Sequence, residues 1–285
     1  MSAVWTLVSA VWTLAGLTIK EAVRRRLFVA GLLIALLMAG LAFVHIPLRP
    51  STFADDPASE RLLLSQSLGW LGCGMLKFFS SILAVTLAAG AISAEVDRGV
   101  LSTIVPKPLP RMAIYVGKWL GLLMILAVFL LVWGVLLAWA IWIQTHLFHP
   151  RLFVGLLSVA LFPLLFTTLT LFFSSFATYA LSAGLALIAA GVALAEDTLL
   201  LFSRIFSAHS LSVMAHVVSY IVPLSRMNHW ITKGLGGAGF DWSAFSPRGP
   251  GASAVATTNA DMVYIVLYIA VFFALGLVIF QRRDL

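Results

Sequence analysis

The sequence has little charge and almost no cysteine. Of its 285 residues, 10% are charged and 61% are hydrophobic, and Cys73 is the only cysteine. Soluble domains carry about a quarter charged residues, so this composition indicates a membrane protein with several spans. A single cysteine also excludes an internal disulfide framework and any multi-cysteine metal or iron–sulfur site.

Motifs for ATP hydrolysis and for hydrolytic chemistry are missing as well. Gly117-Lys118 resembles the end of a P-loop, but Met112 occupies the position of the first glycine and Trp119 that of the serine or threonine. The chain has no HExxH or GxSxG motif, and no close acid pair falls within an apolar run. We therefore expect no catalytic residue and no cofactor in this chain.

The basic residues gather at the ends of the apolar runs. The formal net charge of +7 would by itself be compatible with nucleic-acid binding. Because cytoplasmic loops of membrane proteins are enriched in lysine and arginine, the clusters are explained by topology, and we expect no nucleic-acid partner. The residues expected to anchor the cytoplasmic side are Arg24, Arg25, Arg26, Arg282 and Arg283.

Residues 2–26 predict an amphipathic helix that lies in the membrane plane. Small and polar residues recur every three or four positions along one face, with tryptophans beside them, and the segment ends in three arginines. The alternative is an additional span, because the stretch is apolar enough to cross. No positive charge precedes the apolar residues, so we expect no cleavable signal peptide.

The remaining apolar runs predict an all-α polytopic membrane protein with six transmembrane helices, since about 20 residues suffice for one crossing. A short uncharged turn joins the fourth and fifth helices, and Glu196-Asp197 is expected to close the fifth. Lys77 is expected near the outer end of the second, where its ammonium group can reach the interface, rather than to act as a charge inside the membrane. The expected crossings are residues 27–47, 74–92, 115–143, 152–173, 180–195 and 262–280.

The distribution of lysine and arginine favours six spans over seven. With six, ten basic residues fall on the cytoplasmic side and seven on the outer side, besides Lys77. Seven spans would place the C-terminal arginines outside and split the clusters, so we expect both termini in the cytoplasm. Residues 198–260 carry charges, histidines, glycines and prolines, and we expect them to form an extracytoplasmic excursion with interfacial or re-entrant helices.

The histidines all fall at or beyond the expected outer ends of spans. With Met214 and Met227 nearby, they raise the alternative of soft-metal handling. Their spacing has no tight ligand pattern, so we expect no metal site. The six are His45, His146, His149, His209, His216 and His229.

The connector, which we define as residues 92–121, is the longest charged and proline-bearing stretch between two apolar runs. Its first part is amphipathic, and it stops at residues 106–110 because proline cannot continue a helix and restricts the residue before it. A passive loop would need only about five residues. The connector therefore predicts a kinked segment that faces the cytosol and is shaped to bind. Three residues share one helical face and two point elsewhere: Val96, Val100 and Ile104, then Glu95 and Arg98.

A string of residues in the connector matches a family pattern. The string is Glu95, Gly99, Leu101, Pro108, Arg111 and Gly117-Lys118. It resembles the first cytoplasmic loop of the permease subunits of ABC-2 type ATP-binding cassette transporters, and within them the NosY-like permeases. Val100 stands where that family usually has threonine. Residues 18–27 look like the family's elbow helix, which leads into the first span.

The resemblance implies one ABC-2 type transmembrane domain over residues 1–285, with a cytosolic coupling segment at residues 93–110. It also implies a homodimer bound to two copies of a separate ABC ATPase subunit, which would hold the ATP and Mg²⁺. The residues expected to contact the ATPase are Glu95, Val96, Asp97, Arg98, Gly99, Val100 and Ile104. Those expected to shape the loop and meet the membrane surface are Pro106, Pro108, Pro110, Arg111, Gly117 and Lys118. The alternative is that the charged residues only solvate a loop.

The function implied by the resemblance is that of a permease subunit in a prokaryotic inner (cytoplasmic) membrane. It would act in an exporter, with no enzyme activity of its own, and the path would run at the dimer interface along spans one, two and five. An alternative of another class is a non-transporting anchor that transmits ATPase-driven force to an extracytoplasmic partner protein through residues 198–260. A stand-alone secondary transporter or membrane enzyme is disfavoured, because the spans lack inward ionisable pairs.

Overall fold

The computed structural model describes most of the apolar runs. Regular structure within the described residues is helical throughout. The described residues are 2–24, 57–97, 111–146, 151–205 and 259–282, with isolated positions within 29–37 and 210–227. The helices are α1 (Ser2–Arg24), α3 (Pro57–Asp97), α5 (Arg111–Thr145), α6 (Arg151–Ser174), α7 (Tyr179–Ile205) and α10 (Asn259–Arg282).

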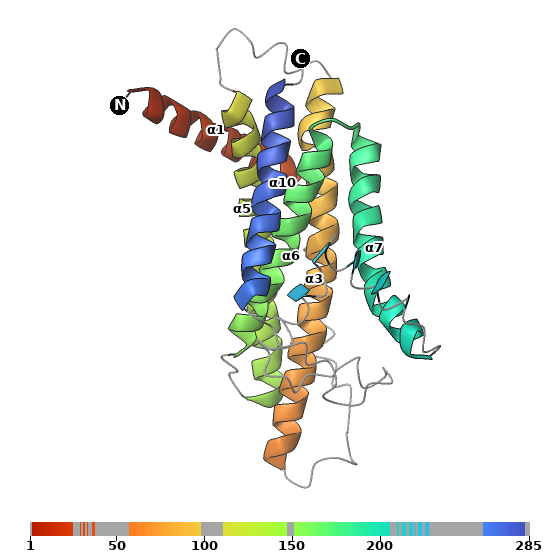
Figure 1. The fold of residues 1–285 in the computed structure, drawn as a ribbon. Helices are drawn as coiled ribbons and strands as arrows, with labels where there is room; N and C mark the ends of the chain where they lie inside the picture. The colour runs from red at the N-terminus through yellow and green to blue at the C-terminus, as the bar shows by residue number, and fades with distance from the viewer. Residues whose placement is uncertain are drawn as a thin grey trace.

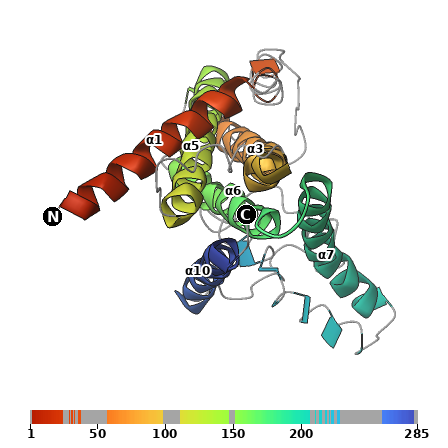
Figure 2. The ribbon, with the colours of Figure 1, turned by 90° about the horizontal axis from the view of Figure 1, so that it is seen from above.

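Four of these helices form an elongated bundle. α3, α5, α6 and α10 run along the long axis of the molecule (Figure 1). α3 packs most extensively on α6, α5 lies against both, and α10 packs on α6 and to a smaller extent on α5. α1 crosses one end of the bundle over α5, whereas α7 leans outward from α3 and α6 (Figure 2).

Four described helices are long and apolar enough to cross a bilayer. They confirm that the chain is a multi-pass membrane protein, and they coincide with the second, third, fourth and sixth predicted spans. Most of the first predicted span lies outside the described residues, so the count of six stays a prediction. The four candidate spans are Leu71–Ser93, Arg111–Thr145, Leu152–Ser174 and Ala260–Arg282, and Tyr179–Val192 is a shorter apolar helix.

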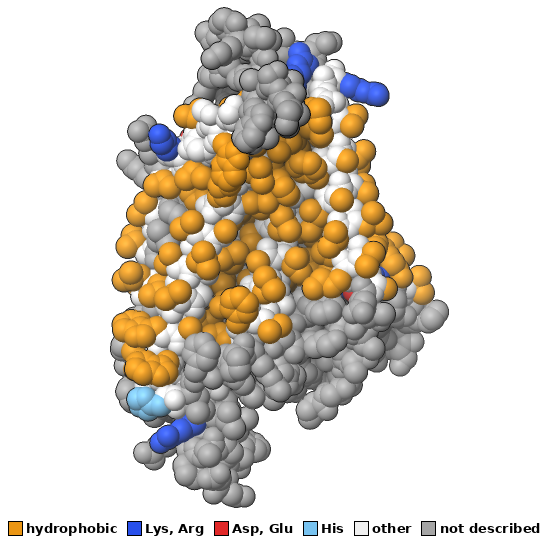
Figure 3. Space-filling model, turned by 90° about the vertical axis from the view of Figure 1, so that its left-hand side faces the viewer, with side chains coloured by type: hydrophobic (Ala, Val, Ile, Leu, Met, Phe, Trp, Pro, Cys, Tyr) orange, Lys and Arg blue, Asp and Glu red, His pale blue; other side chains and the backbone are white. Residues whose placement is uncertain are grey.

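The outward faces of the bundle are apolar. Large side chains such as Leu131, Phe153 and Val263 are each about two-thirds exposed or more, at 68%, 72% and 67%. Figure 3 shows the result on one side of the molecule, where hydrophobic side chains cover the middle and lysine and arginine lie toward the ends. Such a surface suits hydrocarbon rather than water.

The end of the fifth predicted span differs from the structure. Glu196-Asp197 was expected to close that helix, but α7 continues through both residues to Ile205. Glutamate is a good helix former, and the leucines that follow sustain the helix, so the acidic pair does not end it. That prediction was wrong, and the first residues of the expected extracytoplasmic excursion belong to α7.

Lys77 makes a specific contact. It lies on α3 within the Leu71–Ser93 span, and its Nζ is 5.3 Å from the centroid of the Phe162 ring on α6. A cation over an aromatic face is stabilised by the ring quadrupole, and the stabilisation grows as water is removed. The side chain is therefore part of the α3–α6 contact.

Candidate functional site

The connector stands on one end of the bundle. The end of α3, the start of α5, the end of α6, the end of α10 and α1 all meet there (Figure 1). Glu95, Val96 and Asp97 are the last three residues of α3. The other residues expected to contact the ATPase, and the three prolines, lie outside the described residues: Arg98, Gly99, Val100, Ile104, Pro106, Pro108 and Pro110.

The basic anchors lie at this same end as far as the structure describes them. Arg24 is the last residue of α1, and Arg282 is the last residue of α10. Arg25, Arg26 and Arg283 lie outside the described residues. Two of the five expected anchors are thus described, and each ends a helix.

Two glycines allow α1 to touch α5 backbone to backbone. A Cβ added to Gly117 would lie 3.0 Å from the carbonyl oxygen of Val11, and one added to Gly121 would lie 2.8 Å from that of Ala15. Spacing of four residues places both glycines on one helix face. Gly117 was expected to shape the loop, and the structure places it inside α5 as a packing position for α1. The Gly-x-x-x-Gly pattern was the available signal.

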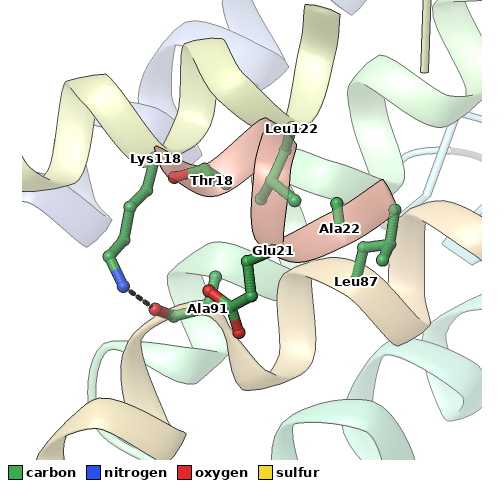
Figure 4. A pocket seen from close by; sticks show the side chains of 7 residues that line it. All are labelled: Thr18, Glu21, Ala22, Leu87, Ala91, Lys118 and Leu122. Carbon is green, nitrogen blue, oxygen red and sulfur yellow. Dashed lines mark hydrogen bonds between the residues drawn. The ribbon is translucent and has the colours of Figure 1, made fainter. Parts of the chain in front are cut away.

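Lys118 lies inside the structure rather than at its surface. Its side chain is 5% exposed, and Nζ donates a hydrogen bond to the carbonyl oxygen of Ala91 on α3 (Figure 4). Because a buried ammonium group needs hydrogen-bond acceptors, this bond stabilises the contact between α5 and α3. Ala91 lies one helical turn before Glu95, so Lys118 connects the start of α5 to the base of the connector.

A small pocket opens beside Lys118 between α1, α3 and α5. The Glu21 side chain of α1 is exposed at this junction, while Ala22 of the same helix is buried. Figure 4 shows the side chains of α1 converging on those of α3 and α5 there. The pocket is lined by Thr18, Glu21, Ala22, Leu87, Ala91, Lys118 and Leu122. The pocket lies where α1, the helix expected to lie in the membrane plane, meets the bundle.

Ser174, the last residue of α6, is inserted beside the hydrogen-bond ladder of α3. Its Oγ donates to the carbonyl oxygen of Ala89 at 2.9 Å and accepts from the backbone N–H of Ser93 at 3.1 Å. Ala89 and Ser93 are four residues apart, so they are the two groups that an α-helix pairs directly. All three residues are buried. Sequence reasoning placed Ser174 in a turn and missed this contact.

Arg111 joins the start of α5 to the end of α10. It is the first residue of α5, and its Nη1 donates to the carbonyl oxygen of Gln281 at 3.1 Å. The last carbonyl groups of a helix have no partner within it, and a guanidinium group there is favourable. Arg111 therefore holds the end of α10 beside the connector.

The opposite end of the bundle contains a cluster that sequence reasoning missed. Nη1 of Arg226 lies 3.1 Å from Oδ1 of Asp261, in the first turn of α10. The Arg226 guanidinium carbon is 4.7 Å from the centroid of the Tyr220 ring and 4.9 Å from that of Tyr264. An arginine between two aromatic faces and a carboxylate is held strongly. The cluster fastens part of the expected excursion to α10.

Metal ligation finds no support in the described part of the chain. No group of three or more histidine, cysteine, aspartate or glutamate side chains comes together there. His146, at the end of α5, is the one histidine that the structure describes, and its ring is 6.2 Å from that of Trp142. The prediction about the other histidines stays open.

Together, the long apolar helices and the hydrogen bonds that join α3, α5, α6 and α10 near the connector define a multi-pass helical membrane protein. Comparison with known families agrees: residues 12–285 match the model of the ABC-2 family transporter proteins. The chain belongs to that family. It is thus a membrane-embedded permease component of an ABC transporter, and the family implies an ABC ATPase as its partner. No curated protein matches the chain.

Proposed function

We propose that this chain is a NosY-like permease subunit of an exporter and works as a homodimer with two ABC ATPase subunits. The ATPase subunits bind ATP and Mg²⁺, and the connector docks on them. The observation that carries the proposal is the fixed base of the connector. Lys118 and Ser174 tie the last turns of α3 to α5 and α6. Movement of an ATPase can be transmitted only through an element held stiffly in this way.

The location of α1 supports the proposed topology. α1 crosses the end of the bundle instead of running along it, and the end of α10 lies at the same end (Figures 1 and 2). Trp12 is 60% exposed and Leu17 is 56% exposed on the faces that α5 does not cover. Apolar side chains turned away from the bundle suit a helix in the membrane interface. We place this helix and both termini on the cytoplasmic side of a prokaryotic inner membrane.

The face that a second copy would cover is on α7. This helix leans away from the bundle, and added Cβ atoms at Gly184 and Gly191 would meet nothing within 4 Å. Leu187 and Ile188 are 55% and 63% exposed on the same helix. Small residues next to exposed apolar ones allow close helix approach. We infer that the two copies meet through α7 and that the path for substrate runs between them.

One observation favours the anchor as a second candidate. The cluster around Arg226 holds part of residues 198–260 against α10. At least this part of the proposed outer segment is therefore structured and does more than link two spans. A fixed outer surface is what a protein partner would need. In this second function the ATPase stroke acts on an extracytoplasmic protein and no solute moves.

The proposed coupling segment can be tested by charge reversal. E95R should leave membrane insertion intact and should weaken co-purification of the ATPase, because a groove that accepts a carboxylate repels a guanidinium group. The matched control is E60R, the same reversal on the outer side of the proposed topology, which should leave co-purification unchanged. Unchanged co-purification in E95R would remove the case for that contact.

Transport and anchoring are separated in reconstituted vesicles. A complex of this chain with its ATPase should move solute across the vesicle membrane when ATP is supplied. The anchor function predicts another result, in which an added outer-face protein stimulates ATP turnover and no solute moves. ATP-dependent activity of the purified chain without any ATPase would contradict both.

A further inference from the structure

α7 leaves much of its apolar surface uncovered by the other described helices. Among the described helices, α7 packs on α3 and α6. Leu181, Leu187 and Ile188 expose more than half of their side chains. Figure 2 shows the helix diverging from the bundle along its length. A displacement of the end of α6 can reach α7 through the turn that joins the two helices.

That turn is closed by hydrogen bonds and is buried on one side. The N–H of Ala177 donates to the carbonyl oxygen of Phe173 at 2.9 Å, and the N–H of Ser182 donates to that of Thr178 at 2.8 Å. The Ser182 hydroxyl donates to the same Thr178 oxygen at 2.8 Å. Ala177 and Ser182 are buried. The Ser182 hydroxyl also lies 3.4 Å from the carbonyl oxygen of Ala177, so hydrogen bonds link the end of α6 through the turn to the start of α7.

Ser174 is the point at which this hydrogen-bonded segment is joined to α3. One hydroxyl can donate once and accept as well, and Ser174 does both, toward Ala89 and Ser93. The N–H of Ile92 also points to its Oγ, at 3.4 Å. The site is buried, where hydrogen bonds are stronger than in water. Asp97, where α3 ends and the undescribed part of the connector begins, is only four residues beyond Ser93.

We propose that Ser174 is the positioning residue that passes movement of the connector to α7. The inference rests on the proposed function, since it needs an ATPase to move the connector. A displacement of the last turns of α3 pulls on Ser174 through its hydrogen bonds to the α3 backbone. The hydrogen-bonded turn then carries the displacement to α7, the helix through which the two copies are proposed to meet. Lys118 joins α5 to the same turns of α3, so that α5 also follows their displacement.

The test compares hydroxyl variants in the complex with the ATPase. A nitroxide label at L187C, in a C73A background, reports the distance between the α7 helices of the two copies with and without vanadate-trapped nucleotide. The variants are S174A, which removes the bridging hydroxyl, and S174T, which keeps it. S158A is the matched control, because Ser158 is a buried serine of α6 whose hydroxyl donates to Val154, four residues earlier in the same helix.

The wild-type label should shift on trapping. S174A should keep ATPase co-purification and basal ATP hydrolysis while the label shift falls by about half or more, and S174T and S158A should behave like wild type. In S174A the Ser93 amide should also exchange with deuterium about fivefold faster, as expected for the loss of one net hydrogen bond. A label shift in S174A equal to that of wild type would overturn the inference.

Two further outcomes separate this inference from the proposed function. A complex that forms and hydrolyses ATP but shows no shift of the α7 label in wild type would overturn the inference and leave the proposed function standing. Failure of any ATPase to bind would overturn both. If S174A does not fold, amide hydrogen exchange in the wild-type complex provides the test. Nucleotide trapping should then change the exchange rates of the Ser93 and Ala177 amides together. A change at Ser93 alone would contradict the link.

Discussion

Lys118 on α5 donates its ammonium hydrogen bond to the carbonyl oxygen of Ala91 on α3, inside the protein and one turn from Glu95. The contact joins the two helices that flank the connector at the point where the connector leaves the bundle. It also borders the pocket under α1, so three elements meet at one side chain. Loosening this contact should free the base of the connector without unfolding the bundle.

We expect K118M to fold and to loosen the end of α3. Replacing a buried charge with an apolar side chain of similar length is often neutral for stability, whereas the hydrogen bond to Ala91 is lost. Amides at residues 92–97 should exchange with deuterium up to about tenfold faster. K20M is the control, because Lys20 lies exposed on α1. Equal exchange in both variants would show that the bond does not hold the connector.

A methyl group at Gly121 should separate α1 from α5. In G121A the new Cβ would lie 2.8 Å from the Ala15 carbonyl oxygen, which is backbone and cannot rotate away. We expect a loss of about 1–3 kcal/mol in the free energy of unfolding, measured in detergent. G74A is the matched control, since nothing lies within 4 Å of its Cβ, and it should be neutral or slightly stabilising. Equal effects would contradict the close approach.

Substitutions at Gly276 and Tyr115 should have strongly non-additive effects on the free energy of unfolding. A Cβ at Gly276 would collide with the Tyr115 hydroxyl oxygen and would lie 3.2 Å from Cα of Phe172. G276A should destabilise the contact of α10 with α5 and α6, by about 2 kcal/mol. Y115F removes the nearer obstacle, so the double variant should recover part of the loss. A double-mutant cycle in thermal unfolding measures the coupling, and strict additivity would contradict this packing.

The Arg226–Asp261 pair should contribute to stability despite its position at the end of the bundle. Its side chains are 22% and 18% exposed, and the guanidinium group lies over two tyrosine rings. We expect a coupling of about 1 kcal/mol between R226A and D261A. R226K keeps the charge but loses the planar stacking, so it should restore only part of the stability. Full restoration by R226K would show that charge alone holds the cluster.

The six-span topology predicts opposite sides for two engineered cysteines. In a C73A background, S102C should react with a membrane-impermeant reagent from the cytoplasmic side and S253C from the outer side. Both positions lie outside the described residues, so the experiment tests the part of the topology that the structure leaves open. Labelling of both from the same side would contradict six spans.

The long apolar helices were predictable because the length of an apolar run is a local property of the chain. The run expected at residues 115–143 is α5, Arg111–Thr145, and the run expected at 152–173 is α6, Arg151–Ser174. Hydrocarbon leaves the backbone no partner except itself, so a sufficiently long apolar run must become a helix. The chain could therefore be identified as a multi-pass membrane protein before any contact was known.

Side-chain roles at the connector's base were not predictable in the same way. Gly117 and Lys118 were expected to shape a loop at the membrane surface, but both are buried in α5, against α1 and α3. Ser174 appeared only as part of a turn. Each role depends on which helix lies opposite, and that depends on how the helices pack rather than on the residue's neighbours in sequence.

For this protein, then, the sequence by itself determined the membrane class, the approximate positions of the four described spans and the family, because hydropathy and a short motif are carried by neighbouring residues. Only the tertiary structure decided which residues hold the connector. The carbonyl oxygen of Ala91 and the N–H of Ser93 are backbone groups with no signature in the sequence. They acquire their partners, Lys118 and Ser174, only when α3, α5 and α6 come together.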